Sequence, residues 1–172
     1  MFTNLGAQNA EMIQNGAPLD QLHVLAGPFF DAFVFMGGSG VIIGLLIAIA
    51  IAGKRRRDML ALGLAPSIFN ISEPVIFGLP IVLNPIFGIP FVIAPIVTTI
   101  ISYLSISFGL VHPIIMATMP WTTPPILGGF MATGHWSGAV LCIVNIAVSI
   151  LIYLPFVVMA EKMDAKKMGI DQ

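Results

Sequence analysis

Charged side chains are scarce in this sequence. They account for 9% of its 172 residues, whereas a soluble globular domain carries roughly 25%. Hydrophobic residues account for 58%, and the mean hydropathy is +1.00. The net charge is -1 at pH 7, and the few basic residues lie in two short groups, so nucleic acid is not an expected partner. This balance excludes an ordinary soluble domain and predicts an all-α integral membrane protein embedded in lipid.

Cysteine is almost absent. Cys142 is the single cysteine and lies inside an apolar run, so neither an intrachain disulfide nor a cysteine-based metal site is expected. The sequence also lacks a P-loop, a dinucleotide fingerprint, a Ser/His/Asp pattern and a cluster of metal ligands. No cofactor or metal is therefore expected, and soluble-enzyme chemistry is not supported. The first residues lack the basic region and short apolar core of a signal peptide, so no targeting peptide is expected.

Basic residues are confined to two short groups, each following an apolar stretch. The seven residues are Lys54, Arg55, Arg56, Arg57, Lys162, Lys166 and Lys167. Short basic flanks of this kind mark the cytoplasmic side of a membrane protein. Three uncharged runs, 32–52, 88–111 and 136–159, exceed the roughly 17 residues needed to cross a bilayer. We predict about three transmembrane helices, the first with its C-terminal end in the cytoplasm.

Two other apolar segments, 66–87 and 112–134, contain four prolines each. Proline removes a backbone donor and clashes with the preceding turn, so neither segment should form one continuous helix. Broken backbone at membrane depth needs protein or a water-filled cavity around it, which predicts two re-entrant hairpins lining a cavity. If both basic groups are cytoplasmic, an even number of crossings separates them. Two full crossings satisfy that count as well, but the proline content favours hairpins, the first opening from the cytoplasm and the second from outside.

The two proline-rich segments also resemble each other. Aligning SEPVIFGL (72–79) with TPPILGGF (123–130) superposes Pro74 on Pro125 and Gly78 on Gly129. Paired interrupted segments indicate the central binding site of a transporter. Chance similarity between apolar stretches is the alternative explanation.

Glu73 is the only charged residue between Asp58 and Glu161. A carboxylate near the bilayer centre costs about 2.5 to 3.5 kcal/mol on insertion scales, so it usually faces an interior and has a function. The alternative is a structural role, because an acidic residue before Pro74 suits the positive end of a helix. The two interpretations are compatible, since a hairpin tip that begins a helix presents both its N–H groups and Glu73 to a ligand.

No basic residue between Asp58 and Glu161 is available to neutralise Glu73, which must be hydrogen-bonded, hydrated or protonated. The nearby polar groups are neutral, and one aromatic ring accompanies them: Asn70, Ser72, Trp121, Thr122 and Thr123. A carboxylate, amides, hydroxyls and one flat ring suit a neutral polyhydroxylated ligand better than an ion. The sequence therefore predicts a sugar site. A membrane-interface position is the alternative for the tryptophan.

The remaining polar residues have simpler explanations. Trp136 begins a predicted span and is expected at the membrane interface, and Asp31 marks the start of the first span. Asn145 and Cys142 lie within a span, where helix packing explains them. Two histidines, His112 and His135, bracket the second proline-rich segment and are expected near the outer surface, while His23 lies in the polar N-terminal region.

Three stretches occur in one order along the chain: FFDAFVFMGGSG (29–40), FNISEPVIFGLPIVLNP (69–85) and MPWTTPPILGG (119–129). With them the chain resembles enzyme IIC, the membrane component of the bacterial phosphotransferase system, in its lactose, cellobiose and diacetylchitobiose branch. The resemblance runs from about residue 12 to 168. It implies a multi-pass protein of the bacterial plasma membrane. In this family the second half of the chain is the sugar-binding domain with two re-entrant hairpins, and the first half forms the dimer interface.

The resemblance also implies roles for individual residues. Glu73 would bind, and help to deprotonate, the sugar hydroxyl that receives phosphate, and Trp121 would pack on the sugar. The phosphoryl donor would be a phosphocysteine on a separate IIB protein that docks from the cytoplasm, so catalysis would require that partner. Cys142 is not that cysteine. The implied activity is translocation of a β-linked disaccharide such as cellobiose with coupled phosphorylation.

The resemblance has one large departure, because residues 1–172 correspond to the C-terminal, sugar-binding part and no first half is present. A functional histidine upstream of the matched region in the family has no counterpart, and His23, His112 and His135 do not replace it. A homodimer is expected for the full-length protein. Two alternatives remain for this chain: a truncated, inactive remnant, or a proton-coupled secondary sugar transporter in which Glu73 carries the proton.

Overall fold

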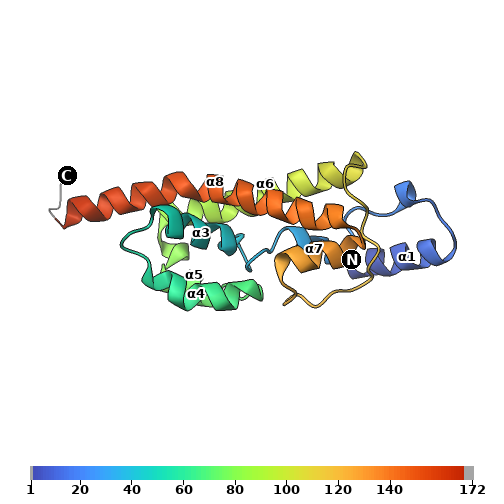
Figure 1. Ribbon diagram of the computed structural model, residues 1–172, viewed down its shortest axis with the longest axis horizontal. Coiled ribbons are helices and arrows are strands. Elements are labelled where there is room, and N and C mark those ends of the chain that lie inside the picture. Colours follow the sequence, from blue (N-terminus) through green and yellow to red (C-terminus); the bar gives the residue numbers. More distant parts are fainter. Residues whose placement is uncertain (1, 169–172) are drawn as a thin grey trace.

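The structure, a computed structural model, describes residues 2–168, and within this range it contains helices and no strands. The first half contains α1 (Phe2–Gln14), the 3-10 turn η1 (Leu19–Gln21), α2 (Pro28–Phe33), α3 (Ile42–Ala52) and α4 (Asp58–Ile68). The second half contains α5 (Glu73–Gly78), the 3-10 turn η2 (Ile81–Leu83), α6 (Pro85–Ser107), α7 (Pro125–Thr133) and α8 (Trp136–Lys167). Figure 1 shows an elongated molecule in which α8 runs along most of the length.

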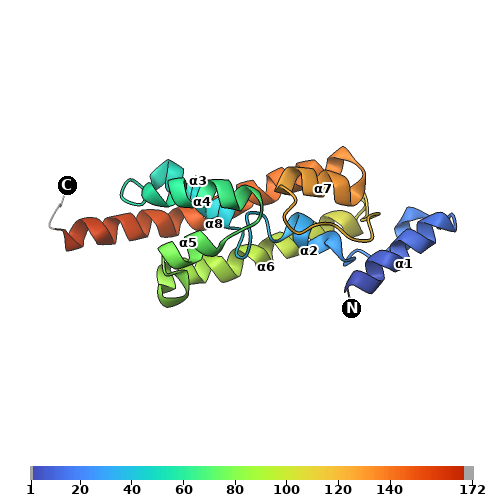
Figure 2. The same cartoon turned by 90° about the horizontal axis from the view of Figure 1, so that it is seen from below.

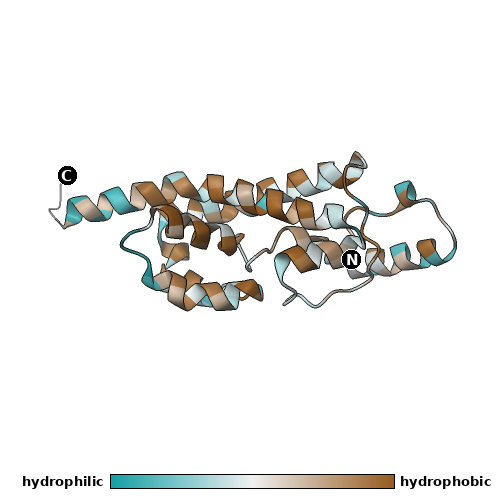
Figure 3. Ribbon diagram, in the orientation of Figure 1, coloured by the Kyte–Doolittle hydropathy of each residue, from teal (hydrophilic) through white to brown (hydrophobic). Residues whose placement is uncertain are grey.

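The two longest helices, α6 and α8, lie side by side and run in opposite directions (Figures 1 and 2). In the described part of the chain they alone are long and apolar enough, by length and composition, to cross a membrane. The predicted spans 88–111 and 136–159 are thus confirmed as helices, with shifted boundaries. Figure 3 shows α6 and the middle of α8 as largely hydrophobic, while the C-terminal end of α8 is hydrophilic.

The prediction of one continuous helix over 32–52 is wrong. Helix α2 ends at Phe33 and α3 begins at Ile42, so an irregular segment interrupts the apolar run. Glycines in this segment have positive φ angles, which other residues rarely adopt. Gly38, at φ 95°, also has no room for a side chain, because an added Cβ would lie 2.6 Å from the Cβ of Ser72. Close packing against the first hairpin therefore requires the interruption.

Helix α8 binds the backbone groups that this interruption frees. Three of its side chains donate hydrogen bonds to carbonyl oxygens there: Cys142 to Ala32 (3.3 Å), Asn145 to Phe33 (3.1 Å) and Tyr153 to Gly40 (2.6 Å). Asn145 also donates to the hydroxyl of Ser102 on α6, 2.7 Å away. Asn145 and Cys142 therefore serve helix packing, as predicted, and they satisfy backbone groups that would otherwise be unpaired in an apolar interior.

The first proline-rich segment forms a helical hairpin. Helix α4 runs toward the middle of the molecule, the chain turns at residues 69–72, and α5 leads back to the start of α6 (Figure 2). The hairpin begins earlier than the predicted residue 66, at Asp58, because Pro66 lies in the last turn of α4, which ends two residues later. The prediction that this segment is broken is confirmed.

The second proline-rich segment is also broken, but its two arms differ. An irregular arm leads from the end of α6 to residue 124, and α7 forms the returning arm. The backbone N–H groups of Ile115 and Met116 both donate to the carbonyl oxygen of Ala132, at 2.9 and 3.3 Å. The amide of Asn9 on α1 donates to the carbonyl oxygen of Ile114, 3.1 Å away, which fixes the start of this arm.

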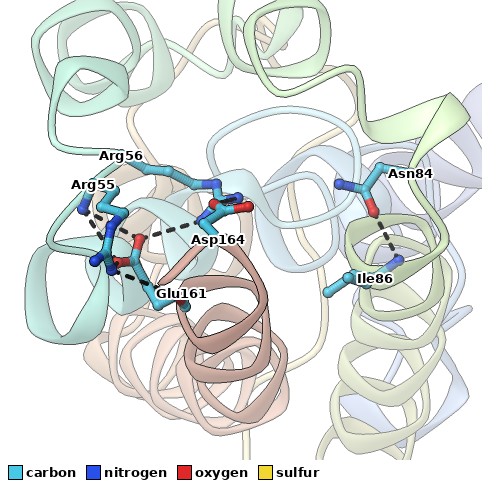
Figure 4. Close-up of polar contacts among 6 residues, drawn as sticks. All are labelled: Arg55, Arg56, Asn84, Ile86, Glu161 and Asp164. Carbon is cyan, nitrogen blue, oxygen red and sulfur yellow. Dashed lines mark hydrogen bonds and ion pairs between the residues drawn. The ribbon is translucent and has the colours of Figure 1, made fainter. Parts of the chain in front are cut away.

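The two basic groups lie at one end of the molecule, as predicted. Arg55 and Arg56 place guanidinium nitrogens 3.5 and 3.2 Å from the carboxylate of Glu161, and Arg56 also pairs with Asp164 (Figure 4). Beside this ionic cluster, the side chain of Asn84 accepts a hydrogen bond from the backbone N–H of Ile86 and caps α6. The cluster thus joins the loop between α3 and α4 to the end of α8.

Candidate functional site

The tips of the two hairpins meet at the side chain of Asn70. Its amide nitrogen donates to the carbonyl oxygens of Trp121, 2.7 Å away, and Thr123, 3.0 Å away. Its carbonyl oxygen accepts from the backbone N–H of Gly37, 2.9 Å away. Asn70 is buried. One side chain therefore connects three interrupted segments: the first hairpin tip, the second hairpin tip and the irregular segment between α2 and α3.

The local sequence explains why Asn70 occupies this position. Helix α4 ends in the hydrogen-bond pattern of a Schellman motif, with the N–H of Ile71 donating to Pro66 and the N–H of Asn70 donating to Ser67. This motif requires one residue in the left-handed conformation, and Asn70 adopts it with φ 60°. Asparagine is among the few residues other than glycine that enter that region readily. The helix end thus sets both the backbone and the direction of the Asn70 side chain.

Ser72 joins two of these three segments, the first hairpin tip and the glycine-rich segment. Its side chain is buried, and its hydroxyl accepts a hydrogen bond from the backbone N–H of Ser39 at 3.2 Å. It precedes α5 as the N-cap residue but makes no capping hydrogen bond through its side chain. The hydroxyl of Ser72 therefore fixes the position of the first tip against the glycine-rich segment.

Glu73 is the first residue of α5, one position after the turn. Its side chain is exposed, and among the described residues it accepts no hydrogen bond and forms no ion pair. The acidic residue lies at the positive end of α5, which agrees with the structural alternative given above. Because no protein group occupies the carboxylate, it is also available to a ligand, three residues from the junction at Asn70.

The second tip contributes an exposed aromatic ring and two threonines. Trp121 is 57% exposed although its backbone is fixed by Asn70. Thr123 is partly buried, and its hydroxyl donates to the carbonyl oxygen of Pro120 at 2.7 Å. Thr122 is partly buried, and no hydrogen bond of its hydroxyl occurs within the described residues. The tip therefore presents a ring and one free hydroxyl from a backbone that is held in place.

The six residues that the sequence predicted for the site have two different positions in the structure. Asn70, Ser72 and Thr123 use their polar side-chain groups within the protein. Glu73, Trp121 and Thr122 leave theirs available. The backbone N–H groups of Gly37 and Ser39 were not predicted as part of this junction. The GGSG sequence was the available signal, because consecutive glycines inside an apolar run indicate close backbone approach.

The histidines occupy other parts of the molecule. The rings of His112 and His135 contact each other at the far end from the ionic cluster, with centroids 4.8 Å apart. His23 lies near α1, where its backbone exchanges hydrogen bonds with Asn9. In the described part of the chain, no group of three or more His, Cys, Asp and Glu side chains is placed to hold a metal ion.

Comparison with known proteins points to one family. A family model described as "Phosphotransferase system, EIIC" matches residues 2–95. The "PTS system cellobiose-specific EIIC component" of Lactococcus lactis is 44% identical over 165 residues, covering 90% of this chain and 33% of the relative. The "PTS system oligo-beta-mannoside-specific EIIC component" of Bacillus subtilis is 42% identical over 148 residues, covering 84% of this chain and 34% of the relative.

A solved structure is similar over nearly the whole chain. It is the crystal structure of the transporter ChbC, the IIC component from the N,N'-diacetylchitobiose-specific phosphotransferase system. The TM-score is 0.89 at 36% identity, covering 99% of this chain and 40% of that one. The chain spans about a third of the length of the curated relatives that it matches.

Proposed function

Because the chain belongs to the EIIC family of the phosphotransferase system, we propose that it forms the sugar-binding part of a permease for a β-linked disaccharide such as cellobiose. In this proposal the protein lies in a bacterial plasma membrane, with α6 and α8 as spanning helices and both hairpins re-entrant. The end that carries the ionic cluster faces the cytoplasm, because its flanks hold the basic residues.

A neutral sugar is the substrate class that the site favours. The relatives' names refer to cellobiose, oligo-β-mannosides and diacetylchitobiose, which all contain β-linked sugar rings. Around the junction at Asn70 the chain offers a carboxylate, a hydroxyl and an indole ring but no cation. An exposed ring next to polar groups can pack on the C–H face of a sugar while the polar groups bind its hydroxyls.

In this proposal, one set of residues contacts the sugar and a second set holds the first in position. Glu73, Trp121 and Thr122 contact the sugar, because their side-chain groups are unoccupied. Asn70, Ser72 and Thr123 position them, because their polar groups bind the backbone of the protein. The observation that carries the proposal is that an unpaired carboxylate, the only charge in a long apolar stretch, lies beside the junction of three interrupted segments.

The chemistry that follows is phosphoryl transfer from a phosphocysteine on a IIB protein. The sugar hydroxyl oxygen attacks phosphorus, the sulfur–phosphorus bond breaks, and the hydroxyl proton passes to the carboxylate of Glu73. Such a reaction depends mainly on positioning and charge stabilisation, and Glu73 supplies the orienting carboxylate. Cys142 is buried in α8 and donates to Ala32, so it is not the donor cysteine.

Binding of cellobiose to the detergent-purified chain, measured by calorimetry, tests the proposal. Glu73→Gln should weaken binding by about tenfold or more, because a hydrogen bond to a charged group contributes about 1.5 to 3 kcal/mol. Glu11→Gln is the matched control, since Glu11 is exposed on α1, away from the junction. If the folded wild-type chain binds none of the β-linked disaccharides, the sugar-site proposal fails for this chain.

An unpaired carboxylate also suits a second function, proton-coupled sugar transport, in which Glu73 carries the proton. Uptake into vesicles separates the two functions. Sugar uptake that continues without a phosphoryl donor and stops when the proton gradient is collapsed would favour the secondary transporter. Uptake that requires the phosphorylated IIB partner would favour the permease.

A further inference from the structure

A cavity lies at the end of the molecule opposite the ionic cluster. Its volume is about 710 Å³, and it is bounded by η1, the end of α6, the start of the second hairpin and the start of α8. Small-molecule sites usually occupy about 300 to 1,000 Å³. The side chains with polar or aromatic groups in its wall are Asp20, Ser107, His112, His135, Trp136 and Ser137. The function proposed above uses none of them.

Three aromatic rings in this wall lie next to one another in space, in the order His112, His135, Trp136. The ring centroids of His112 and His135 are 4.8 Å apart, and those of His135 and Trp136 are 5.7 Å apart. Trp136 is 65% exposed, so its ring is accessible to a ligand. Aromatic side chains combine a large apolar surface with a polar group, which suits a molecule that has both C–H faces and hydroxyls.

The hydrogen bonds in this wall fix which polar groups remain available. The backbone N–H of His112 donates to the hydroxyl of Ser137 at 3.2 Å, and the backbone N–H of Ser137 donates to Nδ1 of His135 at 3.2 Å. Because Nδ1 is occupied in this way, Nε2 is the ring nitrogen of His135 that is left for a ligand. Within the described residues, Nε2 has no partner and the carboxylate of Asp20 forms no ion pair. The cavity wall therefore offers ring nitrogens of His135 and His112, the hydroxyl of Ser107, one carboxylate and an aromatic surface.

The same residues argue against an anion or a metal ion. The cavity wall contains no lysine or arginine among the described residues, and the carboxylate of Asp20 repels an anion. A metal ion is also unsuited, because no three His, Cys, Asp or Glu side chains come together in the described part. A neutral polyhydroxylated molecule can use the carboxylate, the ring nitrogens and the aromatic surface together.

We propose that this cavity is an outer subsite that binds the β-linked disaccharide before the sugar reaches Glu73. The inference rests on the function proposed above, which supplies the ligand. His112 begins the irregular arm of the second hairpin, and the same arm ends at Trp121, whose backbone Asn70 holds. One continuous segment thus connects the outer cavity to the junction, and each site has its own tryptophan, Trp136 on α8 and Trp121 at the second tip.

The two tryptophans of the chain, Trp121 and Trp136, allow the sites to be observed one at a time. In Trp121→Phe, emission comes from Trp136 in the outer cavity, and in Trp136→Phe it comes from Trp121. Both side chains are more than half exposed, so neither substitution empties a packed interior. Each variant of the full chain in detergent is titrated with cellobiose, with glycerol at the same concentrations as the solvent control.

The expected result is a saturable change of Trp136 emission in Trp121→Phe that persists when Glu73→Gln is added. Asp20→Asn in the same background should weaken that change by about tenfold, the effect of one hydrogen bond to a charged group. Glu11→Gln, an exposed carboxylate outside the cavity, should leave it unchanged. Circular dichroism establishes that each variant remains helical.

The results that would overturn the outer subsite differ from those that would overturn the proposed function. If Trp121 responds to sugar and Trp136 does not, the outer subsite is overturned and the proposed function stands. If the response of Trp136 disappears with Glu73→Gln, the two signals report one site and the outer subsite is again overturned. If neither tryptophan responds and calorimetry detects no binding, the proposed function fails together with the subsite.

Discussion

The amide nitrogen of Asn70 lies 2.7 Å from the backbone carbonyl oxygen of Trp121, and this hydrogen bond joins two hairpins that are 51 residues apart in the sequence. The oxygen of the same side chain accepts a hydrogen bond from the backbone N–H of Gly37, so both the nitrogen and the oxygen of the Asn70 amide are bound within the protein. The position of the exposed Trp121 ring therefore depends on a residue that does not itself need to touch sugar. Asn70 is a positioning residue for the second tip.

Removing the Asn70 side chain should destabilise the chain and weaken sugar binding. Asn70→Gly keeps the left-handed backbone but loses the hydrogen bonds, at a cost of about 1 to 3 kcal/mol for the buried groups left unpaired. Asn70→Ala should cost about 1 kcal/mol more, because alanine disfavours φ 60°. Thermal unfolding in detergent measures the loss of stability in both variants, and calorimetry with cellobiose measures the loss of binding. Equal melting temperatures for wild type and Asn70→Gly would show that the junction is not stabilising.

Filling the space at Gly38 should push the first hairpin tip away from the segment between α2 and α3. An added Cβ would lie 2.6 Å from the Cβ of Ser72, so Gly38→Ala should lower both the melting temperature and the affinity for sugar. Gly16→Ala is the matched control, since Gly16 also has a positive φ, 75°, but no atom within 4 Å of an added Cβ. The control should lose about 1 kcal/mol from backbone strain alone and keep its affinity. Equal effects of the two substitutions would contradict a role for close packing.

Tyr153→Phe should destabilise the interrupted segment by about 1 to 2 kcal/mol, because the carbonyl oxygen of Gly40 loses a buried hydrogen bond. Tyr103→Phe makes the same chemical change on α6 at a side chain that is 43% exposed, and it should have little effect. Chemical denaturation of both variants in detergent compares the two. A similarly small loss of unfolding free energy in both variants would mean that water takes over the hydrogen bond that the Tyr153 hydroxyl donates to Gly40.

The ionic cluster should contribute measurably because Glu161 is buried. Glu161→Gln removes the charge that both arginines share and should destabilise the chain by about 2 kcal/mol. Asp58→Asn is the control, since Asp58 is exposed and forms no ion pair within the described residues. The difference in melting temperature between wild type and Glu161→Gln should persist at high salt, because the buried ion pairs of the wild type are screened only weakly. Full stability of this variant would contradict a structural role for the cluster.

The sequence predicted the parts of the fold that composition and proline control. Runs of uncharged residues located α6 and α8, and the prolines located both broken segments. The first broken segment began earlier than predicted because Pro66 is tolerated in the last turn of α4, and α6 began earlier because Pro85 suits the first turn after the cap Asn84. Helix α6 continues through Pro90 and Pro95, and the hydroxyl of Thr99 donates to the carbonyl oxygen of Pro95 at 2.6 Å. Local proline content alone does not reveal such support.

The interruption between α2 and α3 was missed because hydropathy does not register hydrogen bonds made far away in the sequence. Residues 32–52 are uncharged and mostly apolar, and the partners that stabilise the break, Asn145 and Tyr153, lie more than a hundred residues later. The site showed the same limit. The polar residues of both tips were predicted together, but their division into ligand-facing and positioning groups depends on the particular contacts of Asn70 and Ser72.

Hydrogen bonds from α8 to the segment between α2 and α3 also set an order for biogenesis. The ribosome makes the interrupted segment long before it makes Asn145 and Tyr153, so during synthesis the carbonyl oxygens of Phe33 and Gly40 at first lack these hydrogen-bond donors. During that interval the segment needs water or the insertion machinery around it, because lipid cannot bind those oxygens. Integration of α8 thus completes the segment between α2 and α3, and a ribosome stalled before α8 should leave the nascent chain open to proteolysis at residues 34–41.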